Sequence, residues 1–486
     1  MSKQRKISIC TFIVFVVLLL SINAQAKIWY VDRDAPKGGD GTSWYTAFNH
    51  LQSAIDAATG MYIVCMAPPD QIYVKSGTYT FKSTIELDKY VSVYGGFPNA
   101  MATPEMSDRN WKKFPTILDG EGSKSCLSIT SNAILDGFVI RNGYDPHGLG
   151  AGIAMESTPV ECYMGWHHTP KIRNCSIEYN NGGGLHDSES SPVIEDCIFL
   201  ANICSVGGAI ASVNSAPRIE RCVFKANQAT APVSRGGGAI DMVWACYSGS
   251  CDTPVNSPVE ITNCLFRNNA CSTEISSAGG GAIHLYQLWE QAKITNCTFV
   301  DNSAPYSSGG ALFTKNHSCL IQNSILWGNS PNQIGYSGED YRPRVNYTDI
   351  QGGWTGPGHS NINDHPDFVS AVDFHLQAGS PCIDAANDAV APNEDLEKTP
   401  RPLDGDGDGT ATADMGAYEA MAMAEPCQGN FDGDKDVDGK DLSVFAADFG
   451  RTDCDKDCDG DFDKDDDVDG LDLSTFAEDF GRTDCP

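Results

Sequence analysis

The sequence predicts a mainly β protein: a parallel β-helix, in which short strands of successive coils stack along one axis, followed by a small α-helical unit. Two observations predict the solenoid. A nine-residue phrase, I-x-x-C-x-F-x-x-N, returns seven times in varied form over residues 134–329, and a phrase G-G-A-I precedes most copies. A fixed phrase with connections of variable length is typical of a solenoid. The alternation of Cys and Phe at every second position indicates strands.

The repeated phrase places like residues in columns, which stack about 4.8 Å apart if the coils are parallel. In the five full copies the columns are Ile172, Ile194, Ile219, Ile261 and Ile294; Cys175, Cys197, Cys222, Cys264 and Cys297; and Asn180, Asn202, Asn227, Asn269 and Asn302. Two looser copies flank them, with Ile134, Gly137 and Asn142 at one end and Ile321, Ser324 and Asn329 at the other. An apolar column lies two residues past the Cys column: Val139, Ile177, Phe199, Phe224, Phe266, Phe299 and Leu326.

The residue types of these columns predict their roles. We expect Ile, Cys and Phe to fill the core as apolar stacks, with the cysteines acting as small buried hydrophobic residues. The Asn column is expected at a turn, where side-chain amides bond along the stack and satisfy backbone groups that the bend leaves unpaired. The glycine phrases begin at Gly207, Gly237, Gly280 and Gly309. Each coil therefore has at least two strands separated by a corner that needs positive φ or close backbone approach.

The N-terminus predicts export. Lys3, Arg5 and Lys6 precede the apolar residues 7–22, and Ala24 and Ala26 form an A-x-A cleavage site, so residues 1–26 are typical of a secretory signal peptide. A retained membrane anchor is the alternative, although the apolar run is short for a span. No later segment is long and apolar enough to cross a bilayer. We expect the mature chain to be secreted, extracellular or at a cell surface, where disulfides form.

Residues 27–133 are expected to form an N-terminal cap and the first coils. The spacing of Phe48, Leu51, Ile55 and Ala58 predicts a short amphipathic helix over residues 47–58, covering the first coil. Strands are expected over residues 71–79, 84–94 and 116–118. Regular coils over residues 134–329 are followed by last coils and a closing segment over residues 330–420.

Motifs at both ends of the solenoid resemble a known group. The phrases Y-V-D at Tyr30, S-G-T-Y at Ser76 and V-Y-G-G-F at Val93 resemble the opening of secreted bacterial right-handed β-helix proteins of the pectin-lyase-like fold. The G-G-A-I and F-x-x-N phrases are similar to polymorphic outer-membrane protein repeats. G-S-P-C-I-D-A at Gly379 and D-M-G-A-Y-E at Asp414 resemble the closing segment of that group. The resemblance implies a single-stranded right-handed parallel β-helix over residues 28–420, a fold that lyases, hydrolases and adhesins share.

After a linker over residues 421–426, residues 427–486 are two copies of one acidic unit, with 20 acidic and 6 basic side chains. In each copy, oxygen-bearing side chains at places 1, 3, 5, 7, 9 and 12 predict a Ca²⁺ loop. A helix is expected after each loop, over residues 442–449 and 473–480. The predicted ligands are Asn430, Asp432, Asp434, Asp436, Asp438 and Asp441 in the first loop and Asp461, Asp463, Asp465, Asp467, Asp469 and Asp472 in the second.

The duplicated unit resembles the type I dockerin, which implies a cohesin-type protein partner. It departs from that family at place 6, where Lys435 and Asp466 replace glycine. Places 10 and 11 are Gly-Lys and Gly-Leu, so partner specificity does not carry over. Cysteines bracket each copy, which suggests the disulfides Cys427–Cys454 and Cys458–Cys485, each contributing about 3 kcal/mol. A weaker candidate for calcium comprises Asp404, Asp406, Asp408 and Asp414; the alternative is a solvated acidic turn.

One outward column of the solenoid is a candidate catalytic site. The outward residues that follow the glycine corners are His186, Ala211, Asp241, His284 and Phe313. The residues two positions further along each strand are Ser188, Val213, Val243, Tyr286 and Lys315. Asp241 and His284 are expected on adjacent coils with Tyr286 and Lys315 nearby, a set that could serve acid–base chemistry. The alternatives are a solvated surface or a glycan-binding face of Tyr286, Trp289 and Phe313.

Two long connections carry further Cys and His residues. Cys162, His167 and His168 lack the paired spacing of a zinc site, and Cys246 and Cys251 are more typical of a small disulfide-closed loop. The net charge of -31 argues against a nucleic-acid partner. The sequence thus predicts an exported β-helix protein that binds an extracellular glycan or surface partner and carries a calcium-dependent dockerin-like unit. The alternative is a polysaccharide lyase or glycoside hydrolase carried by that unit.

Overall fold

The computed structural model describes residues 26–59, 68–156, 169–230, 236–244, 258–272, 279–288, 290–305, 309–421, 427–454, 458–483 and 485. The chain divides into two compact units. The first comprises residues 1–402 and 412–419, and the second comprises residues 403–411 and 420–486.

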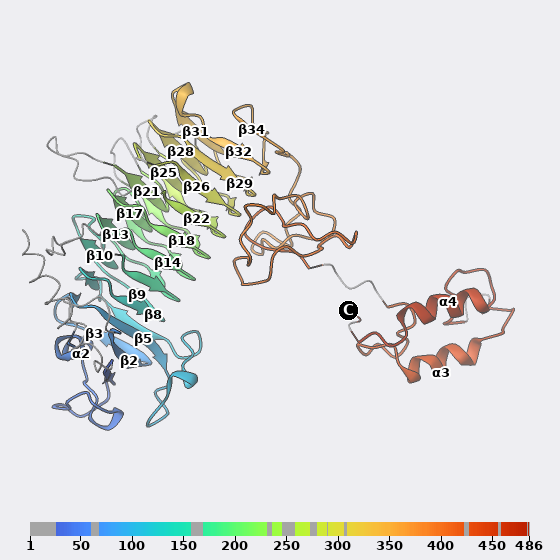
Figure 1. Ribbon diagram of the computed structural model, residues 1–486, viewed down its shortest axis with the longest axis horizontal. Coiled ribbons are helices and arrows are strands. Elements are labelled where there is room, and N and C mark those ends of the chain that lie inside the picture. The colour runs from blue at the N-terminus through green and yellow to red at the C-terminus, as the bar shows by residue number, and fades with distance from the viewer. Residues whose placement is uncertain are drawn as a thin grey trace, which may run out of the picture. The chain divides into compact units, whose positions relative to one another are not determined.

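The first unit is a parallel β-helix whose coils contribute strands to three long sheets, which we call sheets A, B and C (Figure 1). In every sheet the strands follow one another in chain order and all pair in parallel. Sheet A contains β1 (Ile28–Val31), β2 (Asp70–Lys75), β5 (Val91–Phe97), β8 (Ile134–Asp136), β11 (Lys171–Arg173), β14 (Val193–Glu195), β18 (Arg218–Glu220), β22 (Glu260–Thr262), β26 (Ala292–Thr295), β29 (Cys319–Gln322), β32 (Arg344–Asn346) and β34 (Gly358–His359).

Sheets B and C complete each coil. Sheet B contains β3 (Gly77–Thr80), β6 (Thr116–Asp119), β9 (Phe138–Arg141), β12 (Ser176–Glu178), β15 (Ile198–Leu200), β19 (Val223–Lys225), β23 (Leu265–Arg267), β27 (Thr298–Val300), β30 (Ile325–Trp327) and β33 (Asp349–Ile350). Sheet C contains β4 (Ile85–Leu87), β7 (Leu127–Ile129), β10 (Ile153–Glu156), β13 (Leu185–Ser188), β17 (Ile210–Val213), β21 (Ile240–Val243), β25 (Ile283–Tyr286), β28 (Leu312–Lys315) and β31 (Ile334–Ser337). A small sheet joins β16 (Ile203–Cys204), β20 (Gln228–Ala229) and β24 (Ala270–Cys271).

The predicted apolar columns are confirmed. The five cysteines of the repeated phrase are free thiols with at most 1% of their surface exposed, and they share one core with the Ile and Phe columns. Phe199, Phe224, Phe266 and Phe299 stack nearly parallel, with ring centroids 5.0, 4.6 and 4.6 Å apart. The interior is therefore filled by ladders of like side chains, each contacting its equivalent on the next coil.

The Asn column is confirmed as a hydrogen-bonded ladder at the corner between sheets B and C. Asn202 is typical: its Nδ2 donates to the Ile177 carbonyl at 2.8 Å and to Asn227 Oδ1 at 3.0 Å. Its Oδ1 accepts from the backbone and side chain of Asn180. The same pattern continues through Asn269, Asn302 and Asn329. These buried side chains satisfy the backbone groups that the corner leaves unpaired.

The first copy of the phrase is shifted by one residue from its predicted register. Leu135, not Ile134, pairs with Ile172, and Ile140, not Val139, pairs with Ile177. This register places Phe138 rather than Gly137 beside the Cys column and Gly143 rather than Asn142 at the head of the Asn column. Leu135 is fully buried, and a one-residue slip would have turned it to solvent, so burial of the larger apolar side chain set the register.

Glycine corners are required by close approach of the backbone. A Cβ on Gly237 would lie 1.8 Å from the Ile240 carbonyl oxygen, and one on Gly280 would lie 1.8 Å from the Ile283 oxygen. Parallel bridges link Gly207, Gly237, Gly280 and Gly309 along the stack. Neither Gly237 nor Gly280 has positive φ, so close packing of successive corners is the reason for glycine at these two positions.

The N-terminal cap differs in detail from the prediction. The helix α2 spans Leu51–Ala57, shorter than residues 47–58, because the Phe48 backbone pairs with β1 instead, donating to the Tyr30 carbonyl and accepting from Asp32. Short 3₁₀ segments are η2 (Trp44–Thr46), η3 (Met106–Asp108) and η4 (Glu339–Tyr341). The strands expected over residues 71–79 and 84–94 are each split in two, because the chain turns a coil corner within each stretch.

The closing segment folds back on the outer face of the last coils. Phe374 packs on Leu265 and Val300 of sheet B. Asn263 Nδ2 donates to the Glu394 carbonyl at 2.6 Å, and a fully buried ion pair joins Arg401 to Glu419 at 2.6 Å. These contacts cover part of the sheet B surface.

The second unit contains two helices, α3 (Gly439–Asp448) and α4 (Gly470–Asp479), each preceded by an acidic loop (Figure 1). Its core consists of equivalent residues from both copies: Val437 and Val468, Phe445 and Phe476, and Cys454 and Cys485. The rings of Phe445 and Phe476 lie 5.0 Å apart. The duplication thus packs the two copies on each other around matched side chains.

Candidate functional site

The outward column of sheet C brings Asp241 and His284 together, as the sequence indicated. Residues of β21 and β25 pair in register, and His284 Nδ1 lies 2.6 Å from Asp241 Oδ1. Tyr286 and Lys315 are also neighbours, with the Lys315 ammonium 5.6 Å from the Tyr286 ring centroid. His284 Nε2 is buried and has no hydrogen-bond partner among the described residues.

This column is closed to solvent, so the expectation of a solvated surface is wrong at its centre. The side chains of His284 and Asp241 are 0% and 2% exposed, and Phe313 is 3% exposed with its ring stacked 6.0 Å from His284. A sugar therefore has no access to the Phe313 face in this structure. Trp289, the third member of the suggested glycan face, lies outside the described residues.

A further carboxylate, Asp187 of β13, points into the core and was not singled out in the sequence. It is fully buried and accepts hydrogen bonds from the hydroxyls of Ser190 at 2.5 Å and Ser212 at 3.1 Å. Burial raises the pKa of Asp187 to about 6, against the opposing effect of these hydroxyls. Asp187 is therefore a titratable group within the core.

The acidic loops of the second unit close through their twelfth residue. Asp441 is fully buried; its Oδ1 accepts from the Phe431 N–H at 2.8 Å and its Oδ2 from the Asp438 N–H at 2.9 Å. Asp472 is also fully buried and makes the matching bonds with Phe462 and Asp469. Each aspartate thereby ties the start of its loop to the first turn of the following helix, where Asp438 and Asp469 are the N-caps.

Carboxylate oxygens converge within these loops. Oxygens of Asp436, Asp438 and Asp441 lie within 4.8 Å of one another, as do those of Asp467, Asp469 and Asp472. A third such group is Asp461, Asp463 and Asp472. This is the donor set that a hard divalent cation prefers.

Some of these oxygens are buried without a partner. Asp436 Oδ1 and the equivalent Asp467 Oδ1 have no hydrogen bond with any described residue. Desolvation, followed by the charges of neighbouring carboxylates, raises the pKa of Asp436, Asp463 and Asp467. Buried polar atoms normally find partners, so the two orphaned oxygens fit a bound cation.

The two loops differ at one position that bears on cation binding. In the first loop, Lys440 Nζ lies 3.1 Å from Asp434 Oδ2 and 3.5 Å from Asp432 Oδ2. A hydrogen bond from the Asp436 N–H, followed by the Lys440 ammonium, lowers the pKa of Asp434. The second loop has Leu471 at the matching place. At place 6 of that loop, where glycine is usual, Asp466 adopts φ 73° and makes the turn itself.

The disulfides differ from the predicted pairing. Cys427 bonds to Cys485 and Cys454 to Cys458, with Cα atoms 5.4 and 5.1 Å apart. The reason is that each loop pairs with the segment after the other copy's helix: Val437 exchanges backbone hydrogen bonds with residues 481–482, and Val468 with residues 450–451. The cysteine that ends one copy therefore meets the cysteine that begins the other.

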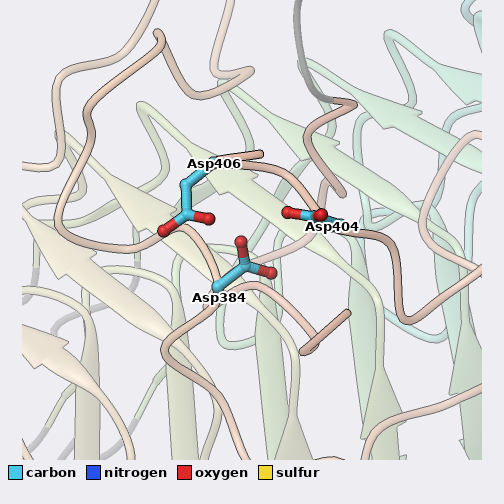
Figure 2. Close-up of side chains that lie close together, drawn as sticks. All are labelled: Asp384, Asp404 and Asp406. Atoms are coloured by element: carbon cyan, nitrogen blue, oxygen red, sulfur yellow. The ribbon is translucent and has the colours of Figure 1, made fainter. Parts of the chain in front are cut away.

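The segment with Asp404, Asp406 and Asp408 forms consecutive side-chain turns. Asp404 accepts from the N–H groups of Gly407 and Gly409, and Asp406 accepts from Asp408. Figure 2 shows Asp404 and Asp406 with Asp384, a residue the sequence did not suggest, as the three carboxylates that lie close together. Asp414 is instead fully buried and accepts from the Asp384 N–H at 2.8 Å.

Several sequence candidates lie outside the described residues. These are the signal peptide apart from its last residue, Cys162, His167, His168, Cys246 and Cys251. Within the part of the chain that the structure describes, no helix combines the length and hydropathy that a bilayer span requires.

Comparison with known proteins identifies the fold class. Residues 116–281 match the family model described as the right-handed β-helix region, so the first unit is a right-handed parallel β-helix. Two similar solved structures are the crystal structure of pectate lyase Pel9A and a rhamnogalacturonan lyase. The first is 12% identical, with a TM-score of 0.38 over 82% of this chain and 98% of that one. The latter is 15% identical, with a TM-score of 0.34 over 71% of this chain and 91% of that one. At these values neither structure bears on activity. No curated protein sequence matches the chain.

Proposed function

We propose that this chain is an exported β-helix protein that binds a glycan or surface partner and is attached through a calcium-dependent, dockerin-like C-terminal unit. The observation that carries the calcium assignment is the matched pair of buried, partnerless oxygens on Asp436 and Asp467 within duplicated acidic loops. An unpaired buried carboxylate oxygen is costly, and Ca²⁺ removes that cost by accepting six to eight oxygen ligands.

The proposed ligands are the oxygen-bearing residues at places 1, 3, 5, 7, 9 and 12. The first loop offers Asn430 and five carboxylates, whereas the second offers six carboxylates. Place 7 normally contributes a backbone carbonyl in such loops, so the side chains of Asp436 and Asp467 add charge there. The second loop therefore has one more carboxylate than the first, and it has Leu471 where the first has Lys440. Both differences favour tighter Ca²⁺ binding by the second loop.

A protein partner of the cohesin type is supported by a repeated apolar surface. Leu442 and Leu473 are 39% and 41% exposed, and Phe449 and Phe480 are each 49% exposed. These residues occupy equivalent places in the two copies. Exposed large apolar side chains at matching places fit a protein contact that either copy can make.

The experiment for the calcium assignment is titration calorimetry of the full chain after treatment with a chelator. We expect two Ca²⁺ per chain, falling to one in Asp441→Asn and in Asp472→Asn. Asp459→Gln is the matched control, because the first copy has Gln428 at that place. It removes one charge but no proposed ligand, so its stoichiometry should remain two. Stoichiometry unchanged in both Asn variants would reject the assignment.

A second candidate function, polysaccharide lyase or glycosidase, is favoured by one observation. Asp241 holds His284 Nδ1 and leaves Nε2 without a partner, an arrangement found in general bases. Catalysis there requires that the covered column open. Product release from a polysaccharide panel, lost in His284→Ala and Asp241→Ala, would establish the enzyme; binding without product that survives both changes supports the non-catalytic function.

A further inference from the structure

An open hollow lies on the corner between sheets B and C of the first unit, away from the Asp241–His284 column. Its volume is about 480 Å³. Three successive coils line it through residues 121–122, residues 142–144, Tyr179 and Asn181. These segments directly follow β6, β9 and β12, and a parallel bridge joins Tyr144 to Asn181. The hollow is therefore built on hydrogen-bonded backbone of the solenoid.

Two tyrosines flank this hollow. Tyr144 is 40% exposed and Tyr179 is 55% exposed, and neither hydroxyl bonds to a described residue. Tyr179 has φ 55°, a left-handed conformation that is unfavourable for a bulky side chain. The same corner position on the next two coils is occupied by Ala201 and Ala226, with φ of 51° and 55°. The fold thus accepts a small residue there, and an exposed ring in a costly conformation points to a role in binding.

Polar groups between the tyrosines remain available to a ligand. Asn142 Nδ2 donates to Asp119 at 3.0 and 3.2 Å, which fixes the amide and leaves its Oδ1 as an acceptor. The Asn181 side chain is exposed and makes no hydrogen bond with the described residues. The site therefore offers an amide that both donates and accepts, a fixed acceptor and two aromatic faces.

The charges beside the hollow are already paired. Arg141 Nε lies 2.9 Å from Asp119 Oδ2, and Lys124 Nζ lies 3.3 Å from Glu121 Oε2. None of the described residues that line the hollow is a lysine or arginine that could hold a carboxylate or sulfate on a ligand. The acidic groups of an anionic saccharide would therefore find no unpaired cation in the hollow, whereas neutral hydroxyl groups suit the amides.

We propose that this hollow binds a neutral oligosaccharide, whose rings stack on Tyr144 and Tyr179 and whose hydroxyls bond to Asn142, Asn181 and Glu121. Tyrosine presents an apolar face with a polar tip, which matches the two kinds of surface of a sugar. The inference rests on the proposed function, since it assigns the glycan of that function to a class and a place. It does not depend on the calcium loops.

The test is titration calorimetry of the full chain in excess chelator, so that calcium binding makes no contribution. The probes are cellohexaose, xylohexaose, mannohexaose and laminarihexaose, with hexagalacturonate as the charged comparison. We expect at least one neutral probe to bind. Tyr144→Ala and Tyr179→Asn should each weaken it at least about tenfold, and Tyr179→Phe should retain most of the affinity. Tyr45→Ala, at a tyrosine 76% exposed on η2, should bind normally.

Tyr179→Asn also separates binding from folding. Asparagine adopts the left-handed conformation more readily than tyrosine, so the variant should unfold at a denaturant concentration no lower than that of the unchanged chain. Binding that survives both tyrosine changes would overturn the hollow as the site while leaving glycan binding intact. Binding of none of the neutral probes, or of hexagalacturonate alone, would overturn the proposal itself.

Discussion

Removing one rung of the asparagine ladder should destabilise the solenoid severely. Asn227 is fully buried and makes four side-chain hydrogen bonds. Its Nδ2 donates to the Phe199 carbonyl at 2.9 Å and to Asn269 Oδ1 at 3.0 Å. Its Oδ1 accepts from Asn202 N at 3.1 Å and from Asn202 Nδ2 at 3.0 Å. Asn227→Ala removes all four bonds at once.

The magnitude follows from the groups left behind. Asn202 loses an acceptor for its backbone N–H and one for its side chain, and the Phe199 carbonyl loses its Nδ2 donor. Asn269 Oδ1 keeps its bond from the Asn227 backbone. Three buried groups losing a partner, at roughly 1 to 3 kcal/mol each, give an expected loss of about 4 kcal/mol in the free energy of unfolding.

The assay is denaturant unfolding followed by circular dichroism at the β-sheet band, with Asn268→Ala as the matched control. Asn268 directly precedes Asn269, the next rung of the ladder, and among the described residues its side-chain oxygen accepts only from Arg267. The chain already has Ala at the equivalent place on two neighbouring coils. The control should lose less than about 1 kcal/mol. A loss in Asn227→Ala no greater than in the control would refute the reasoning about the ladder.

Three further predictions concern other parts of the chain. The folded-state pKa of Asp187 is raised to about 6 from 3.8, so its contribution to stability is full below pH 4 and is lost as the pH rises to 6. Urea unfolding should therefore show Asp187→Asn to be more stable than the unchanged chain by up to about 3 kcal/mol at pH 7.5 and similar to it at pH 3.5. Equal stability of the two proteins at both pH values would contradict this prediction. Phe224→Ala should cost about 3 to 5 kcal/mol, because the ring is fully buried between two stacked neighbours, and Phe224→Leu should cost clearly less in the same assay. Lys440→Leu, which copies the second loop, should raise the calcium affinity of the first loop about two- to fivefold by calorimetry, and an unchanged affinity would show that the lysine does not compete.

The sequence predicted the columns of the solenoid because stacking makes equivalent residues share one environment. The predicted register was wrong by one residue at Ile134, because the spacing of the repeat does not show that Leu135 is the residue buried in the core. Alternation also showed that Asp241 and His284 are neighbours. It could not show that the column is covered, because exposure depends on segments distant in sequence.

The second unit shows a similar division. Spacing identified the acidic loops and the following helices, because those features are local. The disulfides were wrong because they depend on how the copies pair: four cysteines allow three pairings, and the bracketed spacing suggested the pairing within copies. Asp384 was missed for the same reason, since it approaches Asp404 and Asp406 from a turn earlier in the chain.

Calcium binding by the acidic loops is tested most directly by a crystal structure of the full chain grown with calcium, with anomalous data to locate the ions. We expect one calcium in each acidic loop, ligated by Asp441 in the first and Asp472 in the second at about 2.3 to 2.6 Å. Asp436 Oδ1 and Asp467 Oδ1 should each lie within bonding distance of an ion. Loops of the same shape with no ion in either, at millimolar calcium, would contradict it.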